Sequence, residues 1–213
     1  MLKEVEECIL NGQIKDVKDI INKTLIEENI AANKIFEVMN NSIKLVGNKF
    51  GKGEMFLPEL MASAQAMKDG MLILKPELAG QEENMKILGR VLIGTNEGDI
   101  HDIGKALIVL MMENAGFEVI DLGVDISSKR FIEEVKNNKP DIIGMSALLT
   151  STMMGQKEVI VRLEEENLRN HVKVLVGGSP VTQEWADEIG ADGYGSEANE
   201  AVVVAKRVLG IKE

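Results

Sequence analysis

Five short apolar runs, each followed by a stretch with helical spacing, dominate the chain from residue 86 onward. The runs are RVLIGT (90–95), FEVIDLG (117–123), DIIGMSA (141–147), VKVLVGG (172–178) and a short ADGYG (191–195). The helical stretches that follow them cover roughly 103–115, 128–138, 153–169, 181–189 and 197–209. Strands buried on both faces have continuous apolar runs, and their alternation with helices is typical of a parallel sheet covered on both sides. We therefore predict an α/β domain over residues 86–213, with a flavodoxin/Rossmann-like, doubly wound, five-stranded parallel sheet.

Residues 1–85 have a different pattern, in which apolar residues recur at helical spacing. Pro58 suits the first turn of a helix, where its missing N–H has no partner to lose, and Leu57 before it is expected outside that helix. The polar segment KPELAGQEEN (75–84) predicts a linker. We expect a four-helix bundle followed by this linker. Its predicted core positions are Ile14, Val17, Ile20, Ile21, Leu25, Ile35, Val38, Met39, Val46, Leu57, Leu60, Met61, Ala64, Met67 and Met71.

Charge and cysteine content exclude several classes of protein. The net charge of −11 argues against a nucleic-acid partner, because binding to phosphates rests on clustered Lys and Arg. The single cysteine, Cys8, rules out an internal disulfide framework and fits a reducing cytosol. No run approaches the ~20 apolar residues of a membrane span, and the N-terminus lacks the apolar core of a signal peptide. We expect a cytoplasmic protein with no nucleic-acid or membrane partner.

Small and polar residues follow three of the predicted strands, in GTNEGDIHDIG, SALLTST and GGSPVT. Ligands of open parallel sheets bind beyond the carboxyl ends of the strands, so these three segments predict one site. The first segment has neither the G-x-G-x-x-G spacing of a dinucleotide site nor the Gly-Lys-Ser/Thr of a Walker A loop. Both of these phosphate-binding fingerprints are therefore excluded.

The first segment places His101 two residues after Asp99. A metal-ligating imidazole usually donates its other N–H to a carboxylate or a carbonyl, and Asp99 can accept that bond. A hydroxyl from Ser151 or Thr152 could extend the relay. On the Asp99–His101 pair alone, a turn histidine paired with a neighbouring acid is the simpler interpretation. Gly104 would let a bulky planar group approach the backbone, and Gly177 and Gly178 would leave a slot clear of side chains.

Taken in order, Asp99-x-His101-x-x-Gly104, Ser146-x-Leu148 and Gly177-Gly178 resemble the signature of the cobalamin-binding domain. The wider phrases EGDIHDIGK, DLGVDI, SALLTST and GGSPVT extend the resemblance over residues 88–210. The segment FGKGEMFLPELMASAQAMK (50–68) resembles the helical cap that precedes this domain in methionine synthase and in corrinoid methyl carriers. The resemblance covers nearly the whole chain.

The resemblance implies a bound cobalamin or related corrinoid, in the methylcobalamin, cob(I)alamin and cob(II)alamin states. His101 would be the metal ligand below the cobalt, with Asp99 on its other ring nitrogen. Thr152 would end the relay where methionine synthase has a serine. Gly177 and Gly178 would pack against the displaced nucleotide tail, and Phe50 and Leu57 would cover the methyl-bearing face. The other implied contacts are Gly98, Ile100, Asp102, Ile103 and Gly104 around the corrin, and Ser146, Leu148 and Thr150 along the tail slot.

The function implied by the resemblance is methyl transport. The chain would carry a methyl group on cobalt from a donor-specific corrinoid methyltransferase to an acceptor methyltransferase that uses tetrahydrofolate or coenzyme M. A reductive activator would be a further partner, and the chain itself would be a non-catalytic subunit. The phrase ADGYGSEANEAV favours the methylamine group of such carriers, although donor choice resides in the partner.

Three alternatives share parts of the pattern. The cobalamin-binding subunit of an adenosylcobalamin-dependent mutase carries the same signature but normally lacks a cap containing GEMFLPEL. A light or cobalamin sensor would need an output domain, and no basic helix-turn-helix remains to be assigned. A non-corrinoid, flavodoxin-like signalling domain would explain the sheet without the motifs.

Overall fold

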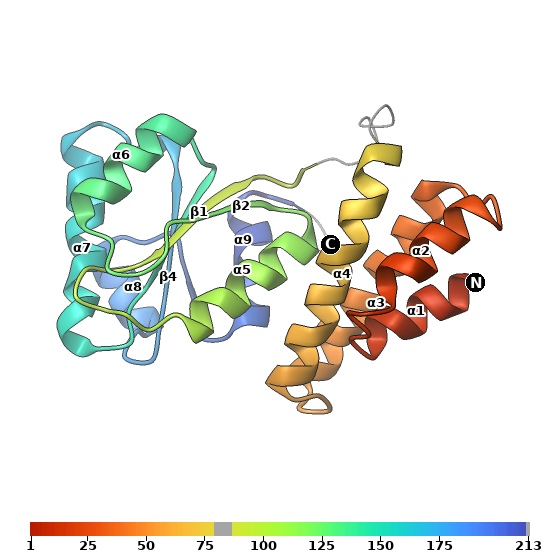
Figure 1. Cartoon of the computed structure of the whole chain (residues 1–213). Coiled ribbons are helices and arrows are strands. Elements are labelled where there is room, and N and C mark those ends of the chain that lie inside the picture. The colour runs from red at the N-terminus through yellow and green to blue at the C-terminus, as the bar shows by residue number, and fades with distance from the viewer. Residues whose placement is uncertain (79–86, 212–213) are drawn as a thin grey trace. The chain divides into compact units, whose positions relative to one another are not determined.

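The computed structural model of the chain describes residues 1–78 and 87–211. The chain divides into two compact units, Met1–Lys86 and Ile87–Glu213, one residue from the predicted boundary (Figure 1). Each unit buries its own set of apolar side chains. No helix within 1–78 or 87–211 is long and apolar enough to cross a membrane.

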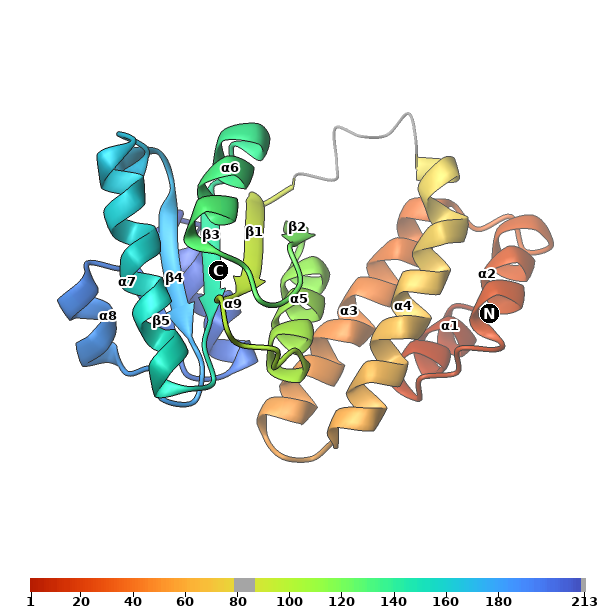
Figure 2. The same cartoon turned by 60° about the vertical axis from the view of Figure 1, so that its left-hand side comes forward.

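The N-terminal unit contains four helices, as predicted. Apolar residues at helical spacing form its core: Ile35, Met39, Ile43 and Val46 are all buried along one face of a single helix. Figure 2 shows the third and fourth helices running side by side. The bounds are α1 Leu2–Leu10, α2 Val17–Ile26, α3 Ala32–Gly51 and α4 Leu57–Leu78.

Helix α4 differs from the prediction at both ends. It begins at Leu57, which was expected outside the helix, because the Glu59 carboxylate accepts the backbone N–H of Phe56 at 2.8 Å and caps the first turn. It continues through Pro76 to Leu78, so residues 75–78 of the predicted linker are helical. Proline removes one helical hydrogen bond, but Leu74 and Leu78 on either side of it are buried. The rest of the predicted linker, 79–84, lies outside the described residues.

Two residues that were predicted for the core of the bundle are exposed instead. Met61 is 53% exposed, and Ile14 is 39% exposed and precedes α2. Their neighbours in the pattern, Met67 and Val17, are buried as expected. The predicted apolar pattern therefore began before the start of α2 and was one residue too wide on α4.

The C-terminal unit is built on a five-stranded parallel sheet with the order β2-β1-β3-β4-β5. This order confirms the predicted doubly wound fold and places the change of winding direction between β1 and β3. In the pairing register Thr95 lies opposite Ser146, and Ser146 lies opposite Gly177. The predicted strand ends therefore meet in one row. The strands are β1 Arg90–Thr95, β2 Glu118–Asp121, β3 Ile142–Ser146, β4 Lys173–Gly177 and β5 Gly193–Gly195.

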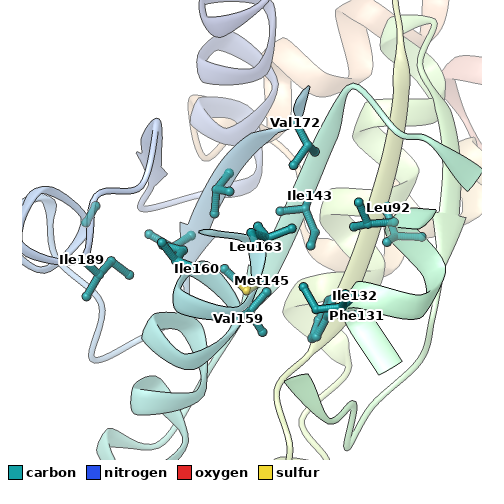
Figure 3. Packing of buried hydrophobic residues seen from close by; sticks show 14 of the residues in the cluster. Leu92, Phe131, Ile132, Ile143, Met145, Val159, Ile160, Leu163, Val172 and Ile189 are labelled. Carbon is teal, nitrogen blue, oxygen red and sulfur yellow. The ribbon is translucent and has the colours of Figure 1, made fainter. Parts of the chain in front are cut away.

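Helices cover both faces of this sheet (Figure 1). One face packs against α6, α7 and α8, and Figure 3 shows its core, in which side chains of α6 and α7 meet those of β1 and β3. The other face packs against α5 and α9 around Val91, Ile142 and Leu175. The helices are α5 Ile103–Ala115, α6 Ser128–Asn138, α7 Thr150–Glu165, α8 Gln183–Ile189 and α9 Ala198–Val208, with a short 3-10 turn η2 at Arg169–His171.

Helix α7 begins at Thr150, three residues earlier than predicted. Leu149 is extended, and its carbonyl accepts the N–H groups of Thr152 and Met153 at 3.1 Å each, which closes the first turn. The helix ends at Glu165, four residues early, and Asn167 then takes a left-handed conformation at φ +57°. The early start places Thr152 on a helix rather than on a loop.

Candidate functional site

The loop between β1 and α5 carries the Asp-x-His motif, and one glycine and two hydrogen bonds hold its shape. Gly98 has φ +80°, a conformation that favours glycine. Its N–H donates to Asp125 Oδ1 at 2.7 Å, which ties the loop to the segment after β2. The buried Thr95 hydroxyl donates to the carbonyl of His101 at 3.1 Å. The loop is thus anchored on both sides of Asp99.

Asp99 is fully buried and accepts four hydrogen bonds. Its Oδ1 accepts from the backbone N–H of His101 at 3.0 Å and from His101 Nδ1 at 2.6 Å. Its Oδ2 accepts from the backbone N–H of Leu148 at 2.7 Å and from Thr152 Oγ1 at 2.9 Å. Burial raises the pKa of this carboxyl, but the four hydrogen bonds outweigh burial and hold its pKa well below the usual range. Asp99 is therefore a carboxylate at neutral pH.

This pairing determines the state of His101. A carboxylate can only accept, so Nδ1 carries the proton, and in the neutral imidazole the lone pair is then on Nε2. The His101 side chain is half exposed, which leaves its ring accessible to a ligand. Within residues 1–78 and 87–211, no group of three or more His, Cys, Asp and Glu side chains could hold a metal ion. His101 alone can offer a ligand one accessible ring nitrogen.

The relay contains Thr152 and not the alternative, Ser151, which is exposed. The extra methyl group of threonine does not disturb the relay, because Thr152 Cγ2 points toward Gly98, which has no side chain. Even a Cβ built on Gly98 would lie 3.6 Å from Thr152 Cγ2, which is an ordinary van der Waals distance. The Thr152 hydroxyl also lies 3.0 Å from the carbonyl of Leu149. Asp99, His101 and Thr152 thus form a continuous hydrogen-bonded chain.

Three residues near His101 expose apolar side chains. Ile100 and Ile103 lie in the same loop and are 76% and 73% exposed, and Leu148, whose backbone N–H bonds Asp99, is 41% exposed. A Cβ added at exposed Gly104 would meet no atom within 4 Å. Exposed apolar side chains that gather near a polar group are typical of a ligand surface.

A slot of about 40 Å³ lies on the α5 and α9 face of the sheet and extends from Val91 and Ile142 to the carboxyl ends of the strands. Its lining there includes Ser146 and Gly177, two of the predicted site residues, together with Ile108, Met112, Gly195 and Ala201. The predicted lining residues Leu148 and Thr150 are not among its described lining and lie exposed at the start of α7. A Cβ at Gly178 would come within 1.8 Å of the Ala147 carbonyl oxygen, so only glycine fits there.

The two predicted cap residues flank the turn between α3 and α4. Phe50 and Leu57 are half-buried within the N-terminal unit. Phe56, which the sequence analysis did not select, is 76% exposed in the same turn. An aromatic side chain this exposed is the stronger structural signal of a contact surface at this end of the unit.

Sequence analysis also missed Lys105, whose side chain is fully buried in the first turn of α5. Its Nζ lies 2.6 Å from both carboxylate oxygens of Asp121 at the end of β2, and 2.7 Å from Asp102 Oδ1. Asp102, a predicted corrin contact, is thereby tied to the sheet. The only signal in the sequence is the acid three residues before the lysine, which is the spacing of a helical ion pair.

Replacing this lysine tests its part in holding the loop. We expect Lys105→Met to lower the free energy of unfolding by about 1–3 kcal/mol. This is less than the loss expected when a fully buried ion pair is broken, because Asp102 and Asp121 are both partly solvated. The fluorescence of Trp185, the one tryptophan, reports urea unfolding of this unit. Lys129→Met removes an exposed pair with Glu133 and should change the free energy of unfolding by less than about 0.5 kcal/mol. Equal stability of Lys105→Met and the original chain would contradict this role.

Comparison with known proteins agrees with this geometry. A family described as "B12 binding domain" matches residues 89–203, and a second family of the same description matches residues 1–75. A corrinoid protein of Desulfitobacterium hafniense is 45% identical over 99% of this chain and 98% of its own length. The trimethylamine corrinoid protein of Methanosarcina barkeri is 41% identical over 99% of this chain and 97% of its own length.

Two solved structures are similar over most of the chain. The methanol:cobalamin methyltransferase complex of Methanosarcina barkeri contains a chain that is 28% identical, with a TM-score of 0.85 over 98% of this chain and 79% of that one. The monomethylamine corrinoid protein of Methanosarcina barkeri is 38% identical, with a TM-score of 0.56 over 96% of each chain. The protein belongs to the B12-binding corrinoid proteins of methylamine and methanol methyltransferase systems.

Proposed function

We propose that this chain carries a methyl group for a methylamine methyltransferase system, with His101 as the lower axial ligand of a bound corrinoid. The observation that carries the proposal is the Asp99–His101–Thr152 chain, which leaves His101 Nε2 free on an open apolar surface. Relatives that match over nearly the full length are named trimethylamine and dimethylamine corrinoid proteins. Their names support an amine as the methyl donor.

When bound, the corrinoid supplies a cobalt centre that accepts a methyl group as cob(I)alamin and yields it as methylcob(III)alamin. The chain's own residues hold and tune this group. His101 would hold the cobalt through Nε2 and would also have to release it during the cycle. A half-exposed imidazole on a loop can do both. Asp99 keeps its proton on Nδ1 and sets the basicity of Nε2.

The surface around the histidine would hold the macrocycle. Apolar contacts would come from Ile100, Ile103 and Leu148. Gly98 and Gly104 have no side chains, so a planar group could approach the backbone of the loop closely. The slot would take the displaced nucleotide tail, with Leu148 and Thr150 beside it. At about 40 Å³ the slot is far smaller than the ~300–1,000 Å³ of typical ligand pockets. Tail entry would therefore require the slot to widen, and its lining includes side chains of both α5 and α9.

The N-terminal unit would shield the methyl-bearing face through Phe50 and Leu57. Its match to a B12 binding family over residues 1–75 favours a carrier over a mutase subunit, which normally lacks this cap. The expected partners are a donor-specific corrinoid methyltransferase, an acceptor methyltransferase that uses tetrahydrofolate or coenzyme M, and a reductive activator. The solved methanol:cobalamin methyltransferase complex is an example of the first kind of assembly.

A methylation assay tests the function. The full chain is loaded with cobalamin, reduced to the cob(I) state and mixed with methyltransferases for methanol, monomethylamine, dimethylamine and trimethylamine, each with its substrate. We expect a stoichiometric absorbance change to methylcobalamin with one of the amine enzymes and not with the methanol enzyme. A chain that binds cobalamin but is methylated by none of the four would contradict the carrier function.

Two variants of the relay should move the Co(II)/Co(I) potential in opposite directions. Asp99→Asn weakens the acceptor, makes His101 a poorer ligand and should raise the potential, because cob(I) needs no axial ligand. Thr152→Val removes a hydrogen-bond donor to Asp99, so Asp99 becomes a stronger acceptor of the hydrogen bond that the His101 imidazole donates. His101 then becomes a better ligand, and the potential should fall. We expect each variant to shift the Co(II)/Co(I) potential by an amount on the order of 20–60 mV, which is the free energy of one hydrogen bond. Redox titration of the loaded protein measures these shifts.

Ser151→Ala is the matched control for the relay. It removes an exposed hydroxyl next to Thr152 that is not among the four donors to Asp99, and it should leave the potential unchanged. Shifts of the same sign in Asp99→Asn and Thr152→Val would show that the relay does not tune the histidine.

A further inference from the structure

We propose that Gln156 is a positioning residue that holds the carboxyl ends of β3 and β4 in the arrangement required by the nucleotide tail of the corrinoid. The inference rests on the proposed function, because it concerns entry of that tail into the slot. Gln156 is not part of the Asp99–His101–Thr152 relay. It lies on the opposite face of the sheet from the slot and acts on the slot through backbone carbonyls of β3 and β4.

The carboxamide of Gln156 is fully buried under α7 and uses both of its ends. Its Nε2 donates to the carbonyl of Met145 at 3.1 Å and to the carbonyl of Gly177 at 3.2 Å. Its Oε1 accepts from Trp185 Nε1 at 3.0 Å. One side chain therefore joins the next-to-last residue of β3 and the last residue of β4 to a residue of α8.

The indole of Trp185 fixes which way the carboxamide points. An indole N–H can only donate, so it must face the oxygen of Gln156. The nitrogen is then directed at the two carbonyls, which can only accept. Each atom of the carboxamide meets a partner of the right kind, and a carboxylate or an apolar group at this position could not bridge the two strands.

The two carbonyls belong to the peptide groups that shape the slot. The Met145 carbonyl is in the peptide that leads to Ser146, and the Gly177 carbonyl is in the peptide that leads to Gly178. Ser146 and Gly177 pair with each other and line the slot. The close approach of Gly178 to the Ala147 carbonyl leaves these peptides little room to rotate independently. Rotation of either peptide would therefore change the mouth of the slot.

Helix α7 connects this bridge to the histidine relay. Thr152 and Gln156 are four residues apart, so they lie on the same face of α7. Thr152 fixes the helix to Asp99, and Gln156 fixes it to the sheet one turn later. The same helix thus positions the histidine relay and the ends of the strands that form the slot.

The test compares two corrinoids that differ only in the tail. Cobalamin carries the nucleotide, and cobinamide lacks it. We expect Gln156→Met in the full chain to raise the Kd of cobalamin about tenfold, the effect of losing one to two hydrogen bonds. The Kd of cobinamide should stay within about twofold of the original value. Absorbance titration measures both constants.

A control variant separates positioning from general loss of stability. Val135 is buried in the same α6–α7 core but contacts neither carbonyl, so Val135→Ala should weaken folding without changing the ratio of the two Kd values. Trp185→Phe keeps an aromatic ring but removes the N–H that orients the carboxamide. It should raise the Kd of cobalamin selectively, by about threefold.

The outcomes are distinct. A selective loss of cobalamin binding in Gln156→Met, with Val135→Ala unchanged, supports the proposal. Equal loss of both corrinoids, or no loss of either, overturns it. Should Gln156→Met fail to fold, an unchanged Kd ratio in Trp185→Phe overturns it instead. An original chain that binds neither corrinoid would overturn the proposed function itself, and this inference with it.

Discussion

The buried carboxylate of Asp99 joins three segments of the chain that are distant in sequence. It accepts hydrogen bonds from the histidine loop, from the backbone after β3 and from the first turn of α7. An isolated buried charge would be costly, and the four donors are what make this one stable. They also hold the carboxylate ionised, which in turn keeps the His101 proton on Nδ1. The ligand state of the histidine therefore follows from a packing arrangement and not from the histidine alone.

The sheet register makes that arrangement possible. Thr95, Ser146 and Gly177 end their strands in one row, so the loops after them converge. Lys105 fastens the start of α5 to the end of β2, and Gln156 fastens α7 to β3 and β4. Each of these buried polar groups has its partners, as a polar network in a core requires. The result is a rigid base below an apolar surface that is open to a ligand.

Much of this architecture could be predicted from the sequence, because it rests on local patterns. The apolar runs gave the five strands, and the Asp-x-His spacing placed a carboxylate beside the imidazole. Helix bounds were less certain. The start of α7 depends on a capping carbonyl at Leu149, and the path of α4 past Pro76 depends on tertiary burial of Leu74 and Leu78. Neither signal is visible in periodicity.

Other parts of the site could not be predicted, because their partners are far apart in the chain. Gln156 reaches carbonyls of two strands and the indole of Trp185, and Asp125 reaches the N–H of Gly98 across 27 residues. Residue spacing left Ser151 and Thr152 both open and only the resemblance selected Thr152, because the choice depends on the first turn of a helix that was expected to start later. The position of Leu148 and Thr150 outside the slot depended on the same turn. Side-chain contacts of this kind are set by topology, and residue spacing alone does not specify them.

Electron paramagnetic resonance of the anaerobically reconstituted cob(II)alamin form tests the central claim most directly. The protein would be made with ordinary histidine and with nitrogen-15 histidine. The chain has two histidines, so His171→Ala is the matched control for His101→Ala. Ligation by His101 predicts that the axial nitrogen splitting changes with the label, persists in His171→Ala and loses its label dependence in His101→Ala. If the splitting in the original protein is the same with and without the nitrogen-15 label, the cofactor keeps its own base as the ligand. That result would contradict the role of the Asp99–His101–Thr152 relay.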